Sequence, residues 1–131
     1  MSRWFVRKIE AANQALMTEG KIDAIARFFT EDYVAHLTSH DMTGGHAAIR
    51  KVIELYRRAF PDLQAHIEIL VAKTDRVAWQ RTLRGTHKGS FTGFPATGQT
   101  MVWRDMVTSR FQDGLIAARW PTLRGRWWLM N

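Results

Sequence analysis

Two runs of alternating residues in the second half of the chain have three ionisable side chains among their odd-numbered positions. The run at positions 77–87 includes Arg81 and His87, and the run at positions 101–111 includes Asp105. The odd-numbered positions of both runs are largely apolar, and in a β-strand they share one face. A carboxylate, a guanidinium and an imidazole on an apolar face suit acid–base chemistry in a small-molecule pocket. A packed core that contains a satisfied charge pair is the alternative interpretation.

We take Asp105 as the candidate base, with His36 or His87 as the candidate acid. His36 lies in a short predicted strand in which either His36 or Leu37 points inward. The remaining candidates are side chains that we expect to line the pocket and bind substrate, although aromatic residues at strand spacing also suit a core: Arg81, Trp79, Trp103, Val107, Trp120, Phe28 and Tyr56. The five histidines lack metal-ligand spacing with a carboxylate, so we expect no metal site.

The segment between the two runs predicts a hairpin centred near Gly93. A hairpin that is symmetrical about this residue places Arg81 directly opposite Asp105, where the two side chains can meet. Each charge would otherwise lie alone on an apolar face, so a bidentate ion pair is the expected arrangement. Such a pair favours the ionised form of Asp105, which makes this residue a poor proton donor and a weak base. A slip of two residues would instead place Arg81 opposite Trp103 or Val107.

Length and composition are typical of one globular domain covering residues 1–131. The chain has 46% hydrophobic residues and no cysteine, which excludes disulfides, thiolate metal sites and cysteine nucleophiles. No apolar run approaches the roughly 20 residues of a membrane span. Glu10 and Asn13 interrupt the segment where a signal peptide needs an unbroken apolar stretch. We therefore expect a cytoplasmic protein with no membrane partner.

The formal net charge is +7, which could attract an anionic partner. The basic residues are spread along the whole chain, and no run of them exceeds two residues. This distribution favours a solvated surface over a nucleic-acid interface. The functional alternative is an anionic ligand, such as a carboxylate or a thioester carrier.

Hydrophobic periodicity predicts an α+β domain. Amphipathic spacing indicates helices at residues 3–18, 22–29 and 46–60, while alternation indicates strands at 33–38 and 63–72, with a loop at 41–45. The two long runs and a third strand that ends at Trp120 follow. The order of elements predicts a curved, antiparallel or mixed sheet wrapped around three helices in the N-terminal half.

Several motifs resemble those of the SnoaL-like polyketide cyclase family, within the nuclear transport factor two-like superfamily. The specific part of the match is the pair of strings Gly85-x-His87-x-Gly89 and Gly93-x-Pro95-x-Thr97-Gly98. Further matches are Asp32-Tyr33-Val34 with His36, Phe60-Pro61-Asp62 and Arg110-Phe111. The resemblance implies a cone in which a bent sheet and three helices enclose a deep apolar cavity. It also implies ring closure by intramolecular aldol condensation, without metal or cofactor.

The chain departs from the family pattern at the positions that carry this chemistry. The family often has an acid/base Asp directly after the last-strand Trp, and here Pro121 follows Trp120. Alignment on a Trp-Pro pair places Arg119 at that position instead. A polar helper in the preceding strand corresponds to Val107. The family's acid/base pair therefore cannot be transferred to this sequence.

Three functions remain open at this stage. The first is cyclase- or isomerase-type chemistry on an apolar cyclic or polyketide-like substrate, with Asp105 as base. The second is a non-catalytic binding module for an apolar or carboxylate-bearing ligand. The third is epoxide hydrolysis, because limonene epoxide hydrolases share the superfamily fold and use two Asp with an Arg. Arg81 and Asp105 would supply one pair for that reaction.

We also expect a homodimer or larger homo-oligomer. The predicted outer face of the sheet mixes apolar and Arg side chains, which is common at interfaces, and the family commonly pairs through this face. At the C-terminus, four large apolar residues at positions 127–130 are expected to close the cavity mouth or to pack on a partner subunit.

Overall fold

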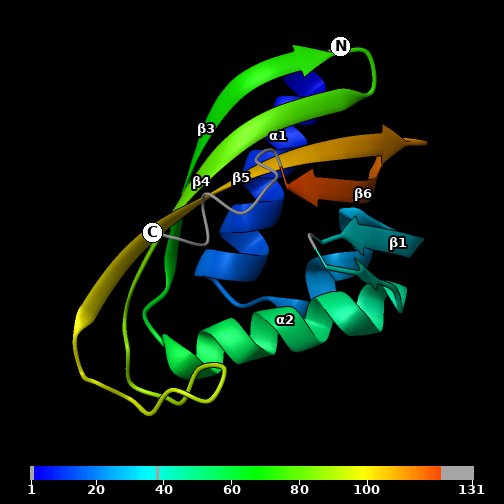
Figure 1. The fold of residues 1–131 in the computed structure, drawn as a ribbon. Coiled ribbons are helices and arrows are strands. Elements are labelled where there is room, and N and C mark those ends of the chain that lie inside the picture. Colours follow the sequence, from blue (N-terminus) through cyan, green and yellow to red (C-terminus); the bar gives the residue numbers. More distant parts are fainter. Residues whose placement is uncertain (1, 38, 122–131) are drawn as a thin grey trace.

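The structure is a computed structural model that describes residues 2–37 and 39–121. Within these ranges, a long curved sheet wraps around the first helix, and α2 crosses near the far end of the long strands (Figure 1). No helix in these ranges is both long and apolar enough to cross a membrane. The expectation for the apolar tail at positions 127–130 falls outside the described residues.

The helical part of the chain has three sections. The first is α1 (Ser2–Ala12), which continues without a break as a π-helix (η1, Asn13–Thr18). A short 3₁₀-helix follows (η2, Ile22–Arg27), and the third section is α2 (Gly45–Ala59). The predicted helix at 22–29 was too long, because Phe29 already pairs with Ile116 in the sheet. This long-range pairing overrides the local helical pattern.

Six strands form one mixed sheet, in the order β2-β1-β6-β5-β4-β3. The strands are β1 (Phe29–His36), β2 (Asp41–Met42), β3 (Gln64–Lys73), β4 (Arg76–Thr86), β5 (Thr100–Gln112) and β6 (Leu115–Pro121). All neighbours are antiparallel except β1 and β6, which run parallel and bring the first and the last strand of the described chain together. The short strand β2 lies where a loop was expected, because two residues are too few to show a periodicity. The predicted α+β fold with a curved sheet around three helices is confirmed.

The register of the central hairpin agrees with the prediction. Arg81 pairs with Asp105, and every pair of β4 and β5 has the predicted symmetry about Gly93. The His87 amide extends the ladder by donating to the Gln99 carbonyl at 2.9 Å. At the tip, Thr92 and Gly93 both have positive φ, which is typical of a type I′ turn whose twist matches that of the flanking strands.

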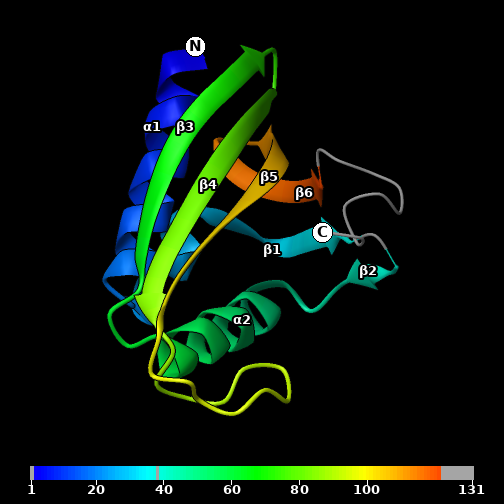
Figure 2. The same cartoon turned by 60° about the vertical axis from the view of Figure 1, so that its left-hand side comes forward.

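The concave face of the sheet carries the core. The odd-numbered positions of β4 are all buried from Val77 to Gly85, whereas the even-numbered positions are partly or fully exposed. The same alternation continues in β5, where Val107, Ser109 and Phe111 are buried. The second view shows α1 running alongside β3, and α2 lying across the lower ends of the long strands (Figure 2). The two helices and the sheet therefore enclose the apolar faces of all three elements.

Candidate functional site

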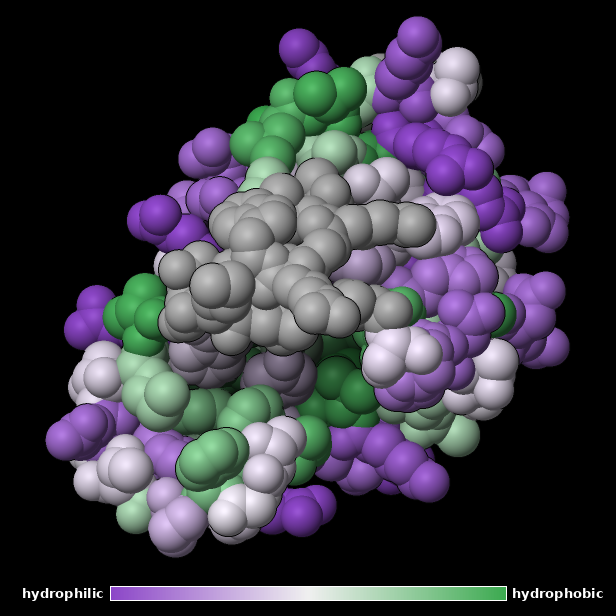
Figure 3. Space-filling view, in the orientation of Figure 1, coloured by the Kyte–Doolittle hydropathy of each residue, from purple (hydrophilic) through white to green (hydrophobic). Residues whose placement is uncertain are grey.

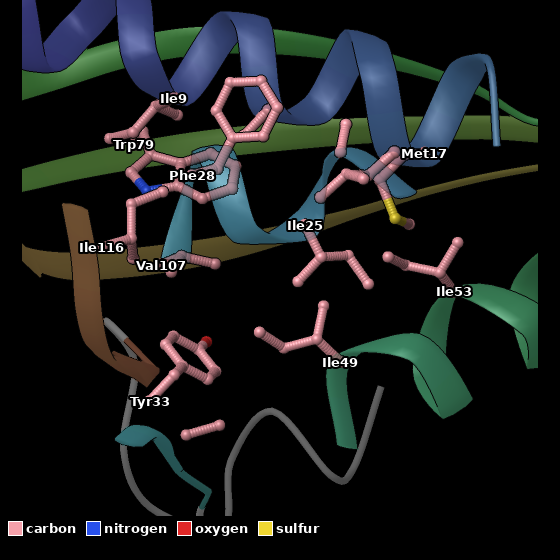
Figure 4. Packing of buried hydrophobic residues seen from close by; sticks show 14 of the residues in the cluster. Ile9, Met17, Ile25, Phe28, Tyr33, Ile49, Ile53, Trp79, Val107 and Ile116 are labelled. Atoms are coloured by element: carbon pink, nitrogen blue, oxygen red, sulfur yellow. The ribbon is translucent and has the colours of Figure 1, made fainter. Parts of the chain in front are cut away.

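A cavity of about 260 Å³ lies between the concave face of the sheet, the first helix and α2. Its walls are mostly apolar, with Ile9 and Leu16 from the first helical section, Ile49 and Ile53 from α2, and Val107 from β5. In the close-up, apolar side chains from these elements converge on a common interior (Figure 4). In the space-filling view, hydrophobic residues are visible in a recess that has hydrophilic residues on its right-hand side (Figure 3). Such a site suits an apolar small molecule.

A small number of polar side chains from six different elements also line the cavity: Asn13, Tyr33, Tyr56, Arg81, Asp105, Ser109 and Arg119. Two of them are guanidinium groups. Within the described residues, Asp105 is the only carboxylate in the lining. Polar groups on opposing elements therefore converge on one interior.

Arg81 and Asp105 form a bidentate ion pair. The Arg81 Nε donates to Asp105 Oδ1 at 3.1 Å, and Nη2 donates to Oδ2 at 2.7 Å. The Arg81 side chain is 9% exposed and that of Asp105 is 31% exposed. Burial alone lowers the pKa of Arg81, but the charge and hydrogen bonds of Asp105 outweigh this effect and raise the pKa above its usual value. The predicted pair is confirmed, and Arg81 remains a cation.

The π-helix contributes a third member to this network. Arg81 Nη1 donates to Asn13 Oδ1 at 3.4 Å, and the buried Asn13 side chain donates in turn to the Ile9 carbonyl at 3.0 Å. A π-helix shifts the facing of its residues relative to a regular α-helix and often occurs at functional sites. Here the π-helix begins at Asn13, whose amide links the first helix to the ion pair of the sheet.

A β-bulge turns Arg119 into the cavity. In the pairing of β5 with β6, Phe111 faces Ile116 and Arg110 faces Ala118, so Ala117 is an extra residue without a partner. Regular alternation would point Ile116 and Arg119 to opposite faces, but the extra residue brings both to the concave side. Arg119 is then the register partner of Ser109, and both line the cavity.

The Arg119 guanidinium has no partner among the described residues. Its Nε is shielded from solvent and makes no hydrogen bond within residues 2–37 and 39–121. Burial, and then the neighbouring charge of Arg81, lower the pKa of Arg119. The hydroxyl of Ser109, on the opposite strand, already accepts a hydrogen bond from Trp79 Nε1 at 3.0 Å. The cavity therefore contains one paired and one unpaired guanidinium.

Tyr33 is a neutral hydrogen-bond donor in the same cavity. Its side chain is buried on β1 and projects toward the interior that α2 also lines (Figure 4). Burial raises the pKa of Tyr33 to about 12, although Arg119 and Arg81 act in the opposite direction. The phenol is therefore protonated at neutral pH.

Neither candidate histidine lines the cavity. His36 lies on the outer side of β1, where its Nδ1 is 2.8 Å from Asp41 Oδ1 and its ring stacks on Trp120 at 4.8 Å. Leu37 lines the cavity instead, which resolves the choice between these two residues. His87 is buried near the hairpin loop, 3.1 Å from Thr97 Oγ1. The geometry gives no support to either histidine as the acid.

The expected substrate-binding residues divide into two groups. Arg81, Trp79, Val107 and Tyr56 line the cavity together with Asp105. The other three do not. Trp103 packs on Phe60 at 4.9 Å, and Trp120 lies on the outer face under the Arg76 guanidinium. Phe28 is buried beside α1, 5.6 Å from Lys8 Nζ. These three aromatic residues form part of the packing around the site rather than its lining.

Sequence reasoning missed several polar groups of the lining. Ser109 lies on the predicted concave face of β5, so alternation alone could have identified it. Asn13 is four residues after Ile9 and three before Leu16, so helical spacing could also have identified it. Alignment on a Trp-Pro pair had placed Arg119 at the family's acid/base position, but the bulge that turns its side chain inward leaves no periodic signal. No cluster of three or more metal-ligating residues occurs in the described ranges.

Comparisons with known proteins agree with this architecture. A family model described as SnoaL-like polyketide cyclase matches residues 7–123. No curated protein matches the chain. The solved structures similar to it include AclR from Streptomyces galilaeus, described as a candidate hydroxylase, with 27% identity, a TM-score of 0.81, and coverage of 99% of this chain and 95% of that one.

Two further solved structures are described as candidate polyketide cyclases. IdmH from Streptomyces antibioticus has 26% identity and a TM-score of 0.75, over 88% of each chain. A protein from Acidithiobacillus ferrooxidans has 22% identity and a TM-score of 0.80, over 92% of this chain and 87% of its own. At 22% identity, this last likeness shows the fold alone.

Breaking the ion pair from one side should destabilise the protein. Asp105→Asn leaves a buried guanidinium without its counter-charge, so we expect a loss of about 2–4 kcal/mol in the free energy of unfolding. The double variant Asp105→Asn, Arg81→Met should lose less than the sum of the two single variants, because no charge is then left unpaired. Urea denaturation of the four proteins measures the coupling.

The matched control is the exposed pair of Arg50 and Glu54 on α2, whose Nε and Oε2 atoms are 3.5 Å apart. Glu54→Gln should cost no more than about 0.5 kcal/mol, because solvent screens this pair. Additive effects of the Arg81 and Asp105 substitutions would contradict the pairing.

Tyr33 should make stability fall at high pH. Its folded-state pKa of about 12 lies above the ordinary tyrosine pKa of 10.0, so the folded protein keeps the phenolic proton to a higher pH than the unfolded chain does. The free energy of unfolding should therefore decrease as the pH rises from 10 toward 12. Tyr33→Phe should remove this part of the decrease and the phenolate absorbance that appears near pH 12, whereas Tyr56→Phe should retain both. Ionisation of Tyr33 near pH 10 would refute the assignment.

Proposed function

Because the chain belongs to the SnoaL-like polyketide cyclase family, we propose that it binds an apolar cyclic or polyketide-like molecule and catalyses cofactor-free ring closure or proton transfer. The observation that carries this proposal is the position of Asp105. It is the one carboxylate among the described lining residues, and it lies in a mostly apolar cavity. A carboxylate with little water around it can take a proton next to a substrate carbonyl.

The ion pair supports Asp105 in this role. Bidentate contact with Arg81 fixes the plane of the carboxylate and uses one lone pair on each oxygen. Each oxygen retains a second lone pair that can accept a proton. The partial exposure of the side chain, compared with the burial of Arg81, leaves the carboxylate accessible to a bound molecule. Asn13 holds Arg81 from the opposite side and so positions the base indirectly.

The register of the sheet also supports a relocated base. The resemblance places the family's acid/base residue at Pro121 or Arg119 and its helper at Val107, which pairs directly with Pro121 across β5 and β6. Asp105 lies on the same face as Val107, two positions along β5. A carboxylate at Asp105 can therefore act on the same part of the cavity from a neighbouring position. Tyr33, rather than a histidine, supplies a neutral donor for a developing enolate oxygen.

One observation favours a second candidate function, in which the protein only binds its ligand. Both carboxylate oxygens of Asp105 already accept hydrogen bonds from Arg81. In this case the pair is a structural link between strands, and the cavity serves as a binding site alone. Epoxide hydrolysis has less support, because its second Asp has no counterpart among the described lining residues.

Turnover by the wild-type protein and by Asp105→Asn tests the enzymatic proposal. Mass-spectrometric screening of aromatic polyketide acids and their esters should find a compound that the wild-type protein converts. The rate should fall at least about 100-fold in Asp105→Asn, which is the contribution of a general base. Asp41→Asn, at a carboxylate outside the cavity, should keep the wild-type rate. Equal rates in wild type and Asp105→Asn would eliminate Asp105 as the base, and binding without turnover would favour the second function.

We further propose that the protein forms a homodimer through the convex face of the sheet. On this face Val102 is 60% exposed and Val71 is 61% exposed, beside the exposed Arg104. Light scattering should therefore give twice the chain mass of 15.2 kDa at micromolar concentration. Val102→Arg should yield monomers, because it adds like charges across the contact, while Ala11→Arg on the exposed side of α1 should not. A mass of 15.2 kDa for the wild-type protein would contradict this proposal.

A further inference from the structure

We propose that Arg119 binds a free carboxylate group of the ligand. The proposal rests on the proposed function in requiring that an apolar molecule occupies the cavity, and it adds the chemical class of that molecule. Arg119 would form a bidentate contact with the ligand carboxylate, which is the geometry that a guanidinium favours. The ligand would then be an apolar cyclic acid rather than its ester.

The first argument is the charge of the cavity lining. Its ionisable groups include two guanidinium groups and one carboxylate within the described residues. Asp105 is committed to Arg81 through two hydrogen bonds. The cavity therefore has an excess positive charge at Arg119. A buried charge without a partner is costly, and an anionic ligand would remove that cost.

The second argument is that Arg119 makes no hydrogen bond within the described residues. Its Nε is shielded from solvent and unpartnered among residues 2–37 and 39–121. The Ser109 hydroxyl, directly opposite, accepts a hydrogen bond from Trp79 and makes none to Arg119. Burial is also the first cause of the lowered pKa of Arg119, which agrees with a guanidinium that lacks compensation.

The third argument is that the backbone departs from regular geometry to bring Arg119 inward. The extra residue Ala117 reverses the facing of β6, and without it Arg119 would point to the convex side and solvent. A cation that could remain in water is instead turned into an apolar cavity. Packing does not explain this arrangement, because an apolar side chain would fill the position at lower cost.

The position of Arg119 also orients the ligand. Ser109, its register partner, is four residues from Asp105 along β5, a backbone separation of about 13 Å. The facing pair of Trp79 and Val107 lies between these two points. A carboxylate on Arg119 would place the ring of the ligand against Trp79 and Val107, with its far edge directed toward Asp105. The two charged residues would thus contact opposite ends of one molecule.

The test compares three probes with the same bicyclic ring, namely 2-naphthoate, methyl 2-naphthoate and 2-naphthamide. Calorimetric titration of the full chain should show that the wild-type protein binds the acid at least about tenfold more tightly than the ester or the amide, because only the acid carries a charge. Arg119→Met should lose this preference and still bind the two neutral probes. Arg119→Lys should retain part of it, since the charge remains but the bidentate geometry is lost.

Arg84→Met is the matched control, because it removes an exposed Arg from the convex face of β4 and lowers the net charge equally. It should keep the preference for the acid.

Thermal unfolding gives a second measurement, which separates ligand binding from a purely structural role of Arg119. Arg119→Met should raise the Tm of the ligand-free protein by relieving the unpaired charge, and a fall in Tm would show that Arg119 is needed for folding and overturn the proposal.

The outcomes separate this inference from the function on which it rests. Equal binding of all three probes by the wild-type protein would overturn the carboxylate anchor and leave an apolar binding site in place. A preference for the acid that survives in Arg119→Met would also overturn it, because another group would then be the anchor. Binding of none of the probes would refute the proposed apolar site and the anchor together.

Discussion

The ion pair of Arg81 and Asp105 is the interaction on which the arrangement of the cavity depends. A guanidinium on the concave face of a sheet has no access to water, so it needs a counter-charge at the same depth. Asp105 supplies the charge from the adjacent strand, and Asn13 supplies an acceptor from the first helix. The network therefore joins the two longest strands to the helix they wrap around. Loss of one member leaves the others buried without compensation.

The same network explains how an apolar cavity can contain charged groups without collapsing. Its walls are hydrophobic side chains of both helices and the sheet, and the charges of Arg81 and Asp105 compensate each other within this lining. Arg119 does not fit this balance, because the described residues offer it no counter-charge. Functional sites often keep such unfavourable groups, since their cost is recovered when a ligand binds. The uncompensated charge of Arg119 therefore indicates what the ligand carries, and it does not serve the stability of the fold.

Two irregularities of the backbone bring polar groups to this cavity. The π-helix begins at Asn13, and the bulge at Ala117 precedes Arg119 by two residues. Each interrupts an otherwise regular element, and the bulge turns Arg119 to a face that regular alternation would not give it. Both occur where the element faces the cavity, and the other polar groups there come from α2 and the strands, such as Tyr56 and Ser109. The family fold thus provides the apolar enclosure, and local departures from regular structure contribute to its chemistry.

The amino-acid sequence by itself determined the fold class, the concave faces of the long strands and the Arg81–Asp105 pair. These features follow from alternation and from the symmetry of a hairpin, which are local rules that need no knowledge of distant contacts. The sequence could not place His36 and His87 outside the cavity, because their positions depend on how β1 and the hairpin loop pack. Nor could it show that Arg119 points inward. The unpaired residue Ala117 changes which face of the sheet the following side chains of β6 point to, and the hydrophobic pattern of the sequence does not reveal this change. Only the tertiary structure decided which polar groups meet, because strands distant in sequence form the cavity together.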